Sequence, residues 1–304
     1  MYPIPTTTSG LGYEDIEETI VYADWVECSA LFQSEIISKA DVQDCFSEID
    51  SFDNEITPLK VADIWSEMER RRLILKSSYP LIIKENRIMP RSWKDHTAYS
   101  FCLLISYSKS CREWMNNYCR DFQMQGELFE HISEAALNYL FKNWKVGITG
   151  WSKNNPVSIK KIIMDIATEL GESIGKESPR PVDKDGGIDI LCYRKFSDLR
   201  GNYPVFFIQC ATGSNWTNKR MENTLNLWNN WIQFKAKNLI TRGFAVPFAF
   251  DDETFRQTQM RGDCLVLDRL RLLAHEVPES EWMPKNTNDK ITSWIEKKYK
   301  TIEV

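Results

Sequence analysis

The sequence predicts a mixed α/β (α+β) protein, in which a small mixed sheet flanked by helices follows a mostly helical N-terminal lobe. Two observations predict this division. No glycine occurs between Gly12 and Gly126, and helix interiors disfavour glycine because it loses the most conformational entropy on folding. From Gly126 onward, helical and strand-like patterns alternate, with turn residues between them. We therefore expect a helical lobe over 1–122, an α/β domain over 123–278 and a helical tail over 279–304.

Apolar residues recur at helical spacing through most of the N-terminal lobe. The segments that we expect to be helical are 14–34, 56–75 and 98–118. Residues 79–89 read Y-P-L-I-I-K-E-N-R-I-M and predict a pair of strands with a turn at E-N. The triplet Arg70-Arg71-Arg72 is typical of a solvated helix face, and a phosphate contact is the alternative.

The α/β domain reads as helix, helix, hairpin, helix, strand. We expect helices at 127–141, 157–174 and 218–238, hairpin strands at 188–193 and 203–211, and later strands at 243–250 and 264–267. We expect residues 147–156 to form a loop and residues 287–300 to form a last helix.

The chemistry concentrates in a segment that reads D-K-D-G-G-I-D-I-L-C-Y and, after a polar link, V-F-F-I-Q-C-A-T-G-S-N-W. If its two strands pair about a centre near Leu199, Asp189 lies directly opposite Gln209. Side chains alternate faces along a strand, so Asp189, Gln209 and Ala211 would share one face. A carboxylate beside a second oxygen ligand can hold a hard divalent cation near a phosphate.

The motif D-G-G-I-D … F-I-Q-C-A resembles the catalytic hairpin of the PD-(D/E)xK nuclease superfamily, closest to its Mrr-like restriction endonuclease branch. That branch has D-x-G-I-D, a strand, a turn and then Q-C-K. The matching residues are Asp185, Gly187, Ile188, Asp189, Gln209 and Cys210. Ala211 stands in the position of the family lysine, which helps to activate the water and to stabilise charge on the phosphate. The resemblance covers residues 123–235.

The resemblance implies a restriction-endonuclease-like fold and a Mg²⁺- or Mn²⁺-dependent endonuclease that hydrolyses phosphodiester bonds of DNA or RNA, as an antiphage or restriction-type effector. The alternative is a catalytically silent nuclease fold that binds nucleic acid or a partner protein. An unrelated α/β interaction protein is a third class. Ala211 favours the silent fold, whereas the retained Asp189, Gln209 and Glu130 favour the enzyme.

The resemblance also implies the metal ligands. Asp189 and the backbone carbonyl of Cys210 would hold the metal, with Gln209 as a neutral ligand or positioning group. In Mrr-like proteins the acid of an F-E pair in the first helix completes the site, and Phe129-Glu130 stands in that helix. The alternatives to Glu130 are Glu169 and Glu172, and the structural interpretation of Glu130 is an exposed carboxylate near a helix start.

A cation from elsewhere in the chain would have to replace the lysine. Lys219, which opens the helix after the hairpin, is the first choice, and Lys184 is the second. The residues that we expect to contact nucleic acid are Trp216, Arg220, Arg269 and Arg271. Trp216 would stack on a base or else cap the core. Arg269 or Arg271 would contact a phosphate or else form an ion pair with Asp268.

Charge and cysteine content limit the partners and the cellular compartment that we expect for the protein. The net charge of −5 and the pI of about 5.5 give no global basic field, so contact with nucleic acid needs a local basic surface. The eight cysteines form no C-x-x-C pair, which disfavours zinc and suits a reducing compartment. Neither a signal peptide nor a long apolar stretch is evident, so we expect a cytoplasmic protein without membrane contact. The expected partners are nucleic acid, DNA above all, a protein of a defence system and a second copy of the chain.

Overall fold

A computed structural model describes residues 1–5, 16–48, 57–149, 159–180, 183, 186–198, 200–213, 216, 221–276 and 281–302. The fold is mixed α/β, and the chain divides into two compact units. Unit 1 comprises Met1–Leu128, Pro247–Asp251 and Asp268–Val304, and unit 2 comprises Phe129–Val246 and Asp252–Leu267. The expected α/β domain of 123–278 is therefore divided between the two units, and the tail of 279–304 belongs to unit 1.

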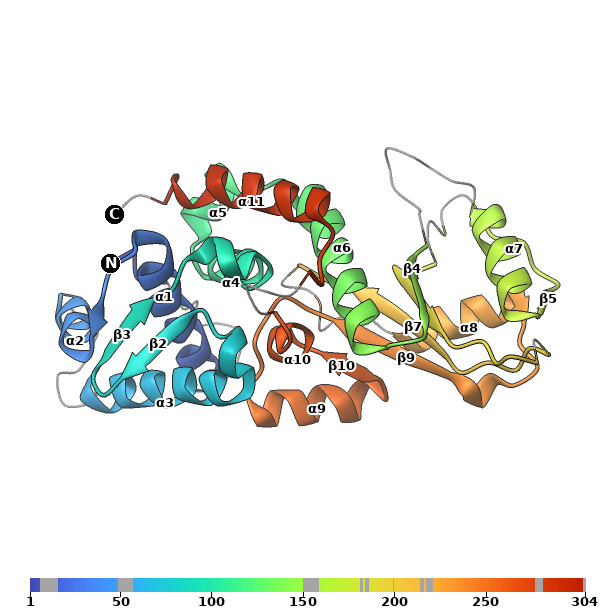
Figure 1. The fold of residues 1–304 in the computed structure, drawn as a ribbon, viewed down its shortest axis with the longest axis horizontal. Coiled ribbons are helices and arrows are strands. Elements are labelled where there is room, and N and C mark those ends of the chain that lie inside the picture. Colours follow the sequence, from blue (N-terminus) through green and yellow to red (C-terminus); the bar gives the residue numbers. More distant parts are fainter. Residues whose placement is uncertain are drawn as a thin grey trace. The chain divides into compact units, whose positions relative to one another are not determined.

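Unit 1 consists of helices and a small antiparallel sheet (Figure 1). Its elements are α1 Ile16–Gln33, β1 Ile37–Ser38, α2 Lys39–Ser47, α3 Thr57–Leu75, β2 Leu81–Lys84, β3 Arg87–Pro90, α4 Thr97–Ser110, α5 Arg112–Tyr118, the start of α6 Phe122–Leu140, α10 Arg269–Leu273 and α11 Lys285–Tyr299. β2 and β3 are the strand pair predicted at 79–89, and β1 pairs with β3. The helix predicted at 98–118 is instead two helices, because the backbone at Cys111 leaves the helical region (φ −117, ψ 74).

Charged side chains are buried inside unit 1. Arg71 on α3 has no exposed side-chain surface, although the sequence placed it on a solvated helix face. Its guanidinium group lies 2.7 Å from Asp24, 2.7 Å from Glu67 and 3.0 Å from Glu27. Because a buried charge without compensation costs several kcal/mol, on the order of 3–5 when one partner is lost, these pairs hold α1 against α3.

Two tyrosines and a second arginine complete this buried network. The hydroxyl groups of Tyr79 and Tyr99 each donate to Glu27 at 2.7 Å. Arg269 pairs with Asp24, and its guanidinium group lies 5.0 Å from the ring centre of Tyr99. Burial alone would raise the pKa of Asp24, but the neighbouring arginines outweigh burial and lower it.

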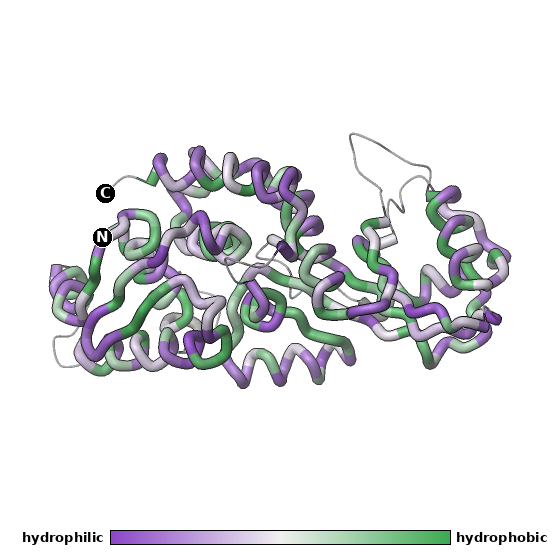
Figure 2. Tube along the Cα trace, in the orientation of Figure 1, coloured by the Kyte–Doolittle hydropathy of each residue, from purple (hydrophilic) through white to green (hydrophobic). Residues whose placement is uncertain are grey.

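Unit 2 is built on a five-stranded mixed sheet with the strand order β10-β9-β7-β6-β4. Its elements are the rest of α6, β4 Lys145–Ile148, α7 Ile159–Leu170, β5 Ser173–Ile174, β6 Ile190–Tyr193, β7 Val205–Cys210, α8 Met221–Trp231, β8 Ile232–Gln233, β9 Ile240–Ala245, α9 Asp252–Gly262 and β10 Leu265–Leu267. The β4–β6 and β6–β7 pairs are antiparallel, whereas the β7–β9 and β9–β10 pairs are parallel. Hydrophilic and hydrophobic residues are interspersed along the helices, as in amphipathic helices (Figure 2).

Helices cover both faces of this sheet. The side chains of one face pack against α7 and α8 in a core that includes Leu191, Tyr193, Val205, Phe207, Ile162, Ile166, Trp228 and Trp231. On the other face, the ring of Phe206 stacks on Phe141, which directly follows α6, with ring centres 5.3 Å apart. Figure 1 shows α6 and α7 on different sides of β4. The structure confirms the expectation of a mixed sheet flanked by helices.

Three expectations about unit 2 were wrong in detail. Residues 145–148 form β4, although a loop was expected from residue 147. β9 ends at Ala245 because Pro247 has no N–H group to continue the ladder, although a strand was expected to residue 250. The helix α9 was not foreseen because none of its residues is buried, so its sequence lacks an apolar stripe.

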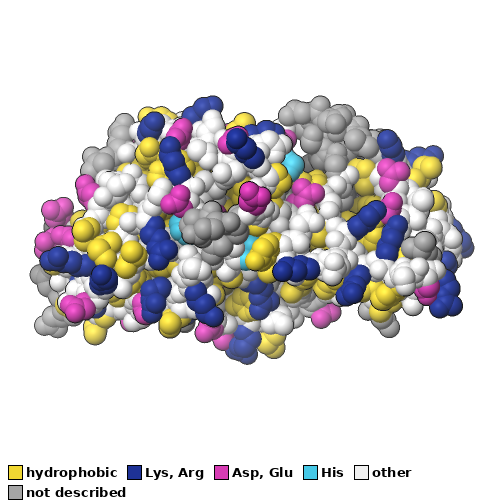
Figure 3. Space-filling view, in the orientation of Figure 1, with side chains coloured by type: hydrophobic (Ala, Val, Ile, Leu, Met, Phe, Trp, Pro, Cys, Tyr) yellow, Lys and Arg dark blue, Asp and Glu magenta, His cyan; other side chains and the backbone are white. Residues whose placement is uncertain are grey.

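The surface carries charges of both signs, and the cysteines form no disulfide bonds. Lys and Arg side chains are interspersed with Asp and Glu on the face shown in Figure 3. All eight cysteines are free thiols. Among the described residues, no helix is both long enough and apolar enough to cross a membrane.

Replacing Arg71 with Met should lower the free energy of unfolding by about 3–5 kcal/mol, because three buried acids around it would lose a shared positive charge. Arg72→Met is the matched control. The side chain of Arg72 is 40% exposed beside Glu69, so its loss should cost at most about 1 kcal/mol. Urea denaturation followed by circular dichroism measures both changes. Equal losses in the two variants would contradict the structural role of the buried network.

The stability of unit 1 should also depend on the protonation of Glu276. This side chain is buried and accepts hydrogen bonds from the N–H groups of Ala98 (2.8 Å) and Tyr99 (2.9 Å) at the start of α4. Burial raises its pKa from 4.5 to about 8. A raised pKa in the folded state means that stability is lost as the pH rises from about 4.5 to about 8. Glu276→Gln should flatten this part of the pH dependence in urea denaturation, and an unchanged slope would refute the assignment.

Candidate metal-binding hairpin

The strands β6 and β7 pair in the register that the sequence predicts. Ile190 lies opposite Ile208, and the N–H group of Asp189 donates to the carbonyl of Ile208 at 3.0 Å. The ladder ends at this pair, and Asp189 and Gln209 lie just beyond it on the two chain segments. The N–H group of Asp189 bonds to β7 whereas its carbonyl accepts from Thr149, so the regular alternation of side chains is interrupted at Asp189.

Main-chain groups on both sides hold Asp189. Its carboxylate oxygen Oδ2 accepts a hydrogen bond from the N–H group of Cys210 at 2.7 Å. On the other side, the N–H group of Thr149 donates to the carbonyl of Asp189 at 2.9 Å, and the Thr149 hydroxyl donates to the carbonyl of Ile188 at 3.0 Å. Because side chains alternate along β7, the thiol of Cys210 lies on the opposite face from Gln209. A metal role for Cys210 is therefore left to its backbone carbonyl.

Gln209 brings a buried oxygen without a partner to this place. Its Oε1 has no hydrogen-bond partner in the described part of the chain. A Cβ atom placed on Gly187 would lie 3.5 Å from Nε2 of Gln209 and 2.9 Å from the hydroxyl oxygen of Thr224 on α8. Thr224 therefore belongs to the surroundings of the site. The sequence did not point to it, because the contact between α8 and the hairpin start joins segments that are distant along the chain.

The two glycines before the acid give α8 its close approach. Gly186 and Gly187 both adopt positive φ (63° and 75°), which favours glycine. A Cβ atom on Gly186 would lie 2.6 Å from the indole nitrogen of Trp228 and 2.5 Å from the ring of Trp231. The indole N–H group of Trp228 donates to the carbonyl of Gly186 at 3.2 Å. Gly186 and Gly187 therefore pack directly against α8, just before Asp189.

The two alternative acids, Glu169 on α7 and Glu172 just after it, lie at the other end of the sheet. Glu169 accepts hydrogen bonds from Tyr193 (2.5 Å) and Lys145 (3.2 Å) and pairs with Lys195 (2.8 Å). Hydrogen bonds from Lys195 and Tyr193 lower its pKa to about 2. Four residues of strand, about 13 Å, separate Tyr193 from Asp189.

Glu172 lies close to the same end. It accepts a hydrogen bond from the N–H group of Lys235 at 3.3 Å. A Cβ atom placed on the adjacent Gly171 would lie 3.4 Å from Gly201, in the link between the hairpin strands. Neither Glu169 nor Glu172 can therefore complete a site at Asp189.

Glu130 lies at the same end of the sheet as Asp189. Glu134, one turn later on α6, accepts a hydrogen bond at 3.3 Å from the N–H group of Ile148, which pairs with Ile190. α6 covers the face of the sheet opposite to the side chain of Gln209, which shares the face of Phe207. Within the described ranges, no three His, Cys, Asp or Glu side chains are grouped so that they could hold a metal.

The other predicted residues have mixed outcomes. Lys184, Lys219 and Arg220 lie outside the described residues. The ring of Trp216 packs 5.7 Å from that of Phe244 on β9, which agrees with its structural alternative of capping the core.

The two arginines near residue 270 also differ from each other. Arg269 is fully buried in unit 1 beside Asp24, so it is not available to a phosphate on the surface. The expected ion pair with Asp268 is also not its contact. Asp268 instead accepts a hydrogen bond from the N–H group of Arg271 and caps α10. The side chain of Arg271 is exposed.

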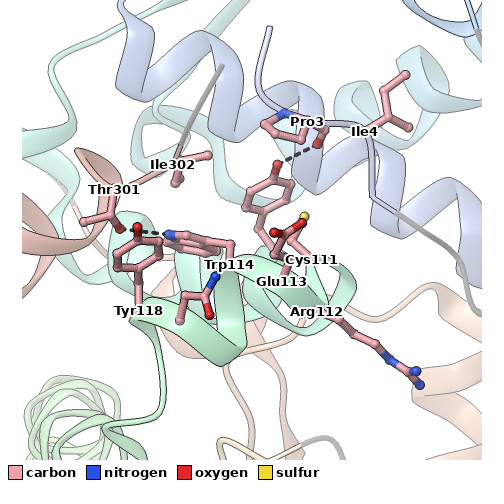
Figure 4. A pocket seen from close by; sticks show the side chains of 11 residues that line it. Pro3, Ile4, Cys111, Arg112, Glu113, Trp114, Tyr118, Thr301 and Ile302 are labelled. Atoms are coloured by element: carbon pink, nitrogen blue, oxygen red, sulfur yellow. Dashed lines mark hydrogen bonds between the residues drawn. The ribbon is translucent and has the colours of Figure 1, made fainter.

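Unit 1 contains a cavity of about 470 Å³ between the first residues, α5 and the last described residues (Figure 4). Its polar groups bond to one another. The hydroxyl group of Tyr107 donates to the carbonyl of Pro3 at 2.7 Å, and the indole N–H group of Trp114 donates to Thr301 at 2.9 Å. Arg112 points away from the cavity. None of the predicted site residues lines it.

Gly187→Ala should destabilise unit 2 by about 1–3 kcal/mol, because alanine is strained at a φ of 75° and its Cβ atom would lie 2.9 Å from Thr224. Gly147→Ala on β4 is the control, since nothing lies within 4 Å of a Cβ atom there. Differential scanning calorimetry of both variants measures the effect. If Gly187→Ala were as stable as Gly147→Ala, the close packing of α8 on the turn would be refuted.

Comparisons with known proteins give no relative from which a function of this site could be inferred. No family model matches the chain, and no curated protein or solved structure matches it. The assignment of the site therefore rests on the contacts that surround Asp189 and Gln209 at the end of the hairpin.

Proposed function

We propose that this protein is a divalent-metal-dependent nuclease of the PD-(D/E)xK type, which hydrolyses phosphodiester bonds of DNA or RNA. One observation supports the proposal: at the end of the hairpin, the carboxylate of Asp189 accepts a hydrogen bond at 2.7 Å from the N–H group of Cys210, the residue after Gln209. The order helix, helix, hairpin, helix, strand around a mixed sheet supports it further. A role as an antiphage or restriction-type effector in the cytoplasm belongs to the same proposal, and the eight free thiols suit that compartment.

The residues present fit a hard divalent cation. Asp189 offers a carboxylate, Gln209 a buried amide oxygen without a partner, and Cys210 a backbone carbonyl. Mg²⁺ and Mn²⁺ prefer such oxygen ligands. A buried acceptor without a partner is costly, and a cation or its water would satisfy it. When bound, the metal would lower the pKa of a water molecule and offset charge on the scissile phosphate.

The chain contributes position more than charge. The N–H group of Cys210 fixes one oxygen of Asp189, and Thr149 fixes the strand that carries it. Ala211 is buried, and its N–H group donates to the carbonyl of Ala245 at 3.0 Å, so this position supplies no cation. In the proposal, Lys219 or Lys184 supplies the missing positive charge.

Glu130 and the basic residue Arg220 complete the proposed site. Glu130 would bind the metal or a water molecule in its shell from α6. Arg220 would contact the nucleic-acid backbone.

Asp189→Asn should reduce cleavage at least about 100-fold, or about 2.7 kcal/mol of transition-state stabilisation, because the amide keeps the shape and removes the charge that holds the metal. Glu169→Gln is the control, since that acid lies at the other end of the sheet. Single-turnover cleavage of plasmid, linear duplex and RNA with Mg²⁺, Mn²⁺ or EDTA measures the effect. Cleavage that persists in Asp189→Asn, or in EDTA, would place the active site elsewhere.

A catalytically silent nuclease fold is the second candidate, and Ala211 favours it. A silent fold would bind oligonucleotides or a partner protein without cutting. Titration calorimetry with Mn²⁺ and with oligonucleotides separates the two. Nucleic-acid binding without metal binding or cleavage would favour the silent fold.

A further inference from the structure

The charge of the chain is divided unevenly between the two units. The whole chain has a net charge of −5, yet unit 2 contains more Lys and Arg than Asp and Glu. Unit 1 therefore carries the acidic excess, and unit 2 carries a basic excess. Because a basic excess in one part of a chain favours nucleic acid as its partner, unit 2 can attract nucleic acid although the chain as a whole is acidic.

Three aromatic rings gather on the face of the sheet that is opposite α7 and α8, at the end far from Asp189. Phe141 follows α6, Trp144 precedes β4 and Phe206 lies on β7. The ring centre of Phe206 lies 5.3 Å from that of Phe141 and 5.2 Å from that of Trp144. All three side chains are only partly buried, so they present ring surface to solvent.

Arg194 adds a positive charge to the same face. It directly follows β6, and its N–H group donates to the carbonyl of Pro204 at 3.3 Å. This bond joins directly opposite residues and so continues the β6–β7 ladder, which places the side chain of Arg194 on the face of Phe206. The side chain is exposed and forms no ion pair within the described residues.

A second positive charge comes from Lys142, which is exposed in the turn that joins α6 to β4. Its Nζ lies 5.5 Å from the ring centre of Tyr139. Glu169, the acid that bonds to Tyr193 at this end of the sheet, lies on the α7 side, where the ring of Tyr193 belongs to the core. Two cations therefore border the aromatic rings, whereas that acid lies on the other face.

Single-stranded nucleic acid matches this surface, because its bases stack on aromatic rings and its phosphates pair with cations. The bases of a duplex are already stacked on one another and do not reach such rings. We propose that single-stranded nucleic acid binds a surface, called here the Trp144 surface, that consists of Phe141, Lys142, Trp144, Arg194 and Phe206. The inference rests on the proposed function for the nature of the partner, and it adds a contact region at the far end of the sheet from Asp189.

The test is the fluorescence anisotropy of labelled oligo-dT and oligo-U, titrated with the whole protein in EDTA so that binding is measured without cleavage. Trp144→Leu should weaken binding about fivefold to a hundredfold, the range for loss of one stacked base, with an unchanged salt dependence. The double variant Lys142→Met/Arg194→Met should lower the slope of log affinity against log salt by about 1.4, because each phosphate contact to a single strand contributes about 0.7.

Phe196→Leu and Lys161→Met are the matched controls. The ring of Phe196 is 50% exposed and lies against Tyr203, which belongs to the core on the α7 side. Lys161 is exposed on α7 itself. Both controls should bind with nearly the affinity of wild type. Melting temperatures measured in parallel identify a variant that fails to fold, and the double variant, which changes exposed side chains alone, decides the case if Trp144→Leu is one.

Four results would overturn the inference. Wild-type affinity and salt dependence in the double variant, or losses no larger than those of the controls, would refute the Trp144 surface and leave the proposed function intact. Tighter binding of a duplex than of oligo-dT would do the same, since stacking on the rings requires unpaired bases. Cleavage with Mg²⁺ or Mn²⁺ but no binding in EDTA would also refute the surface alone. A protein that neither binds nor cleaves nucleic acid would refute the proposed function as well.

Discussion

The candidate site depends on the register between β6 and β7. A slip of one residue would turn every side chain of one strand to the other face and would move Asp189 away from the N–H group of Cys210. Burial on both faces of this part of the sheet opposes such a slip, since Phe207 packs towards α8 and Ile208 lies on the opposite face with no exposure. Thr149 on the neighbouring strand adds two hydrogen bonds at the position of the acid. Core packing therefore fixes the register of β6 and β7, and this register sets where Asp189 and Gln209 lie.

Gly186 and Gly187 belong to the hairpin motif and also pack against α8. These glycines are required because α8 comes within contact distance of both, and the same helix presents Thr224 to the amide of Gln209. The helix that stabilises the hairpin thus also limits which groups can surround it. This coupling explains why the residues that hold Asp189 come from β4, β7 and α8, although only the hairpin carries the sequence signal.

The sequence predicted what depends on local pattern. Strand alternation and turn residues located the hairpin, and symmetry about residue 199 predicted the observed register of β6 and β7. The burial of Arg71 and Arg269 could not be predicted, because their shared partner Asp24 lies far away in the sequence. The short β4 contains a glycine and gives too little alternation to identify. Glu130 was chosen from an F-E pair, whereas the side of the sheet that its helix covers depends on packing that no short motif encodes.

The position of Ala211 limits how this site can work. Ala211 is nearly fully buried, and its N–H group is used in the pairing with β9. A lysine there would have to bury its stem in a closely packed place and desolvate its charge unless it reached Asp189. Under the proposed nuclease function, the positive charge that offsets the scissile phosphate would therefore have to come from the metal and from another position in the chain.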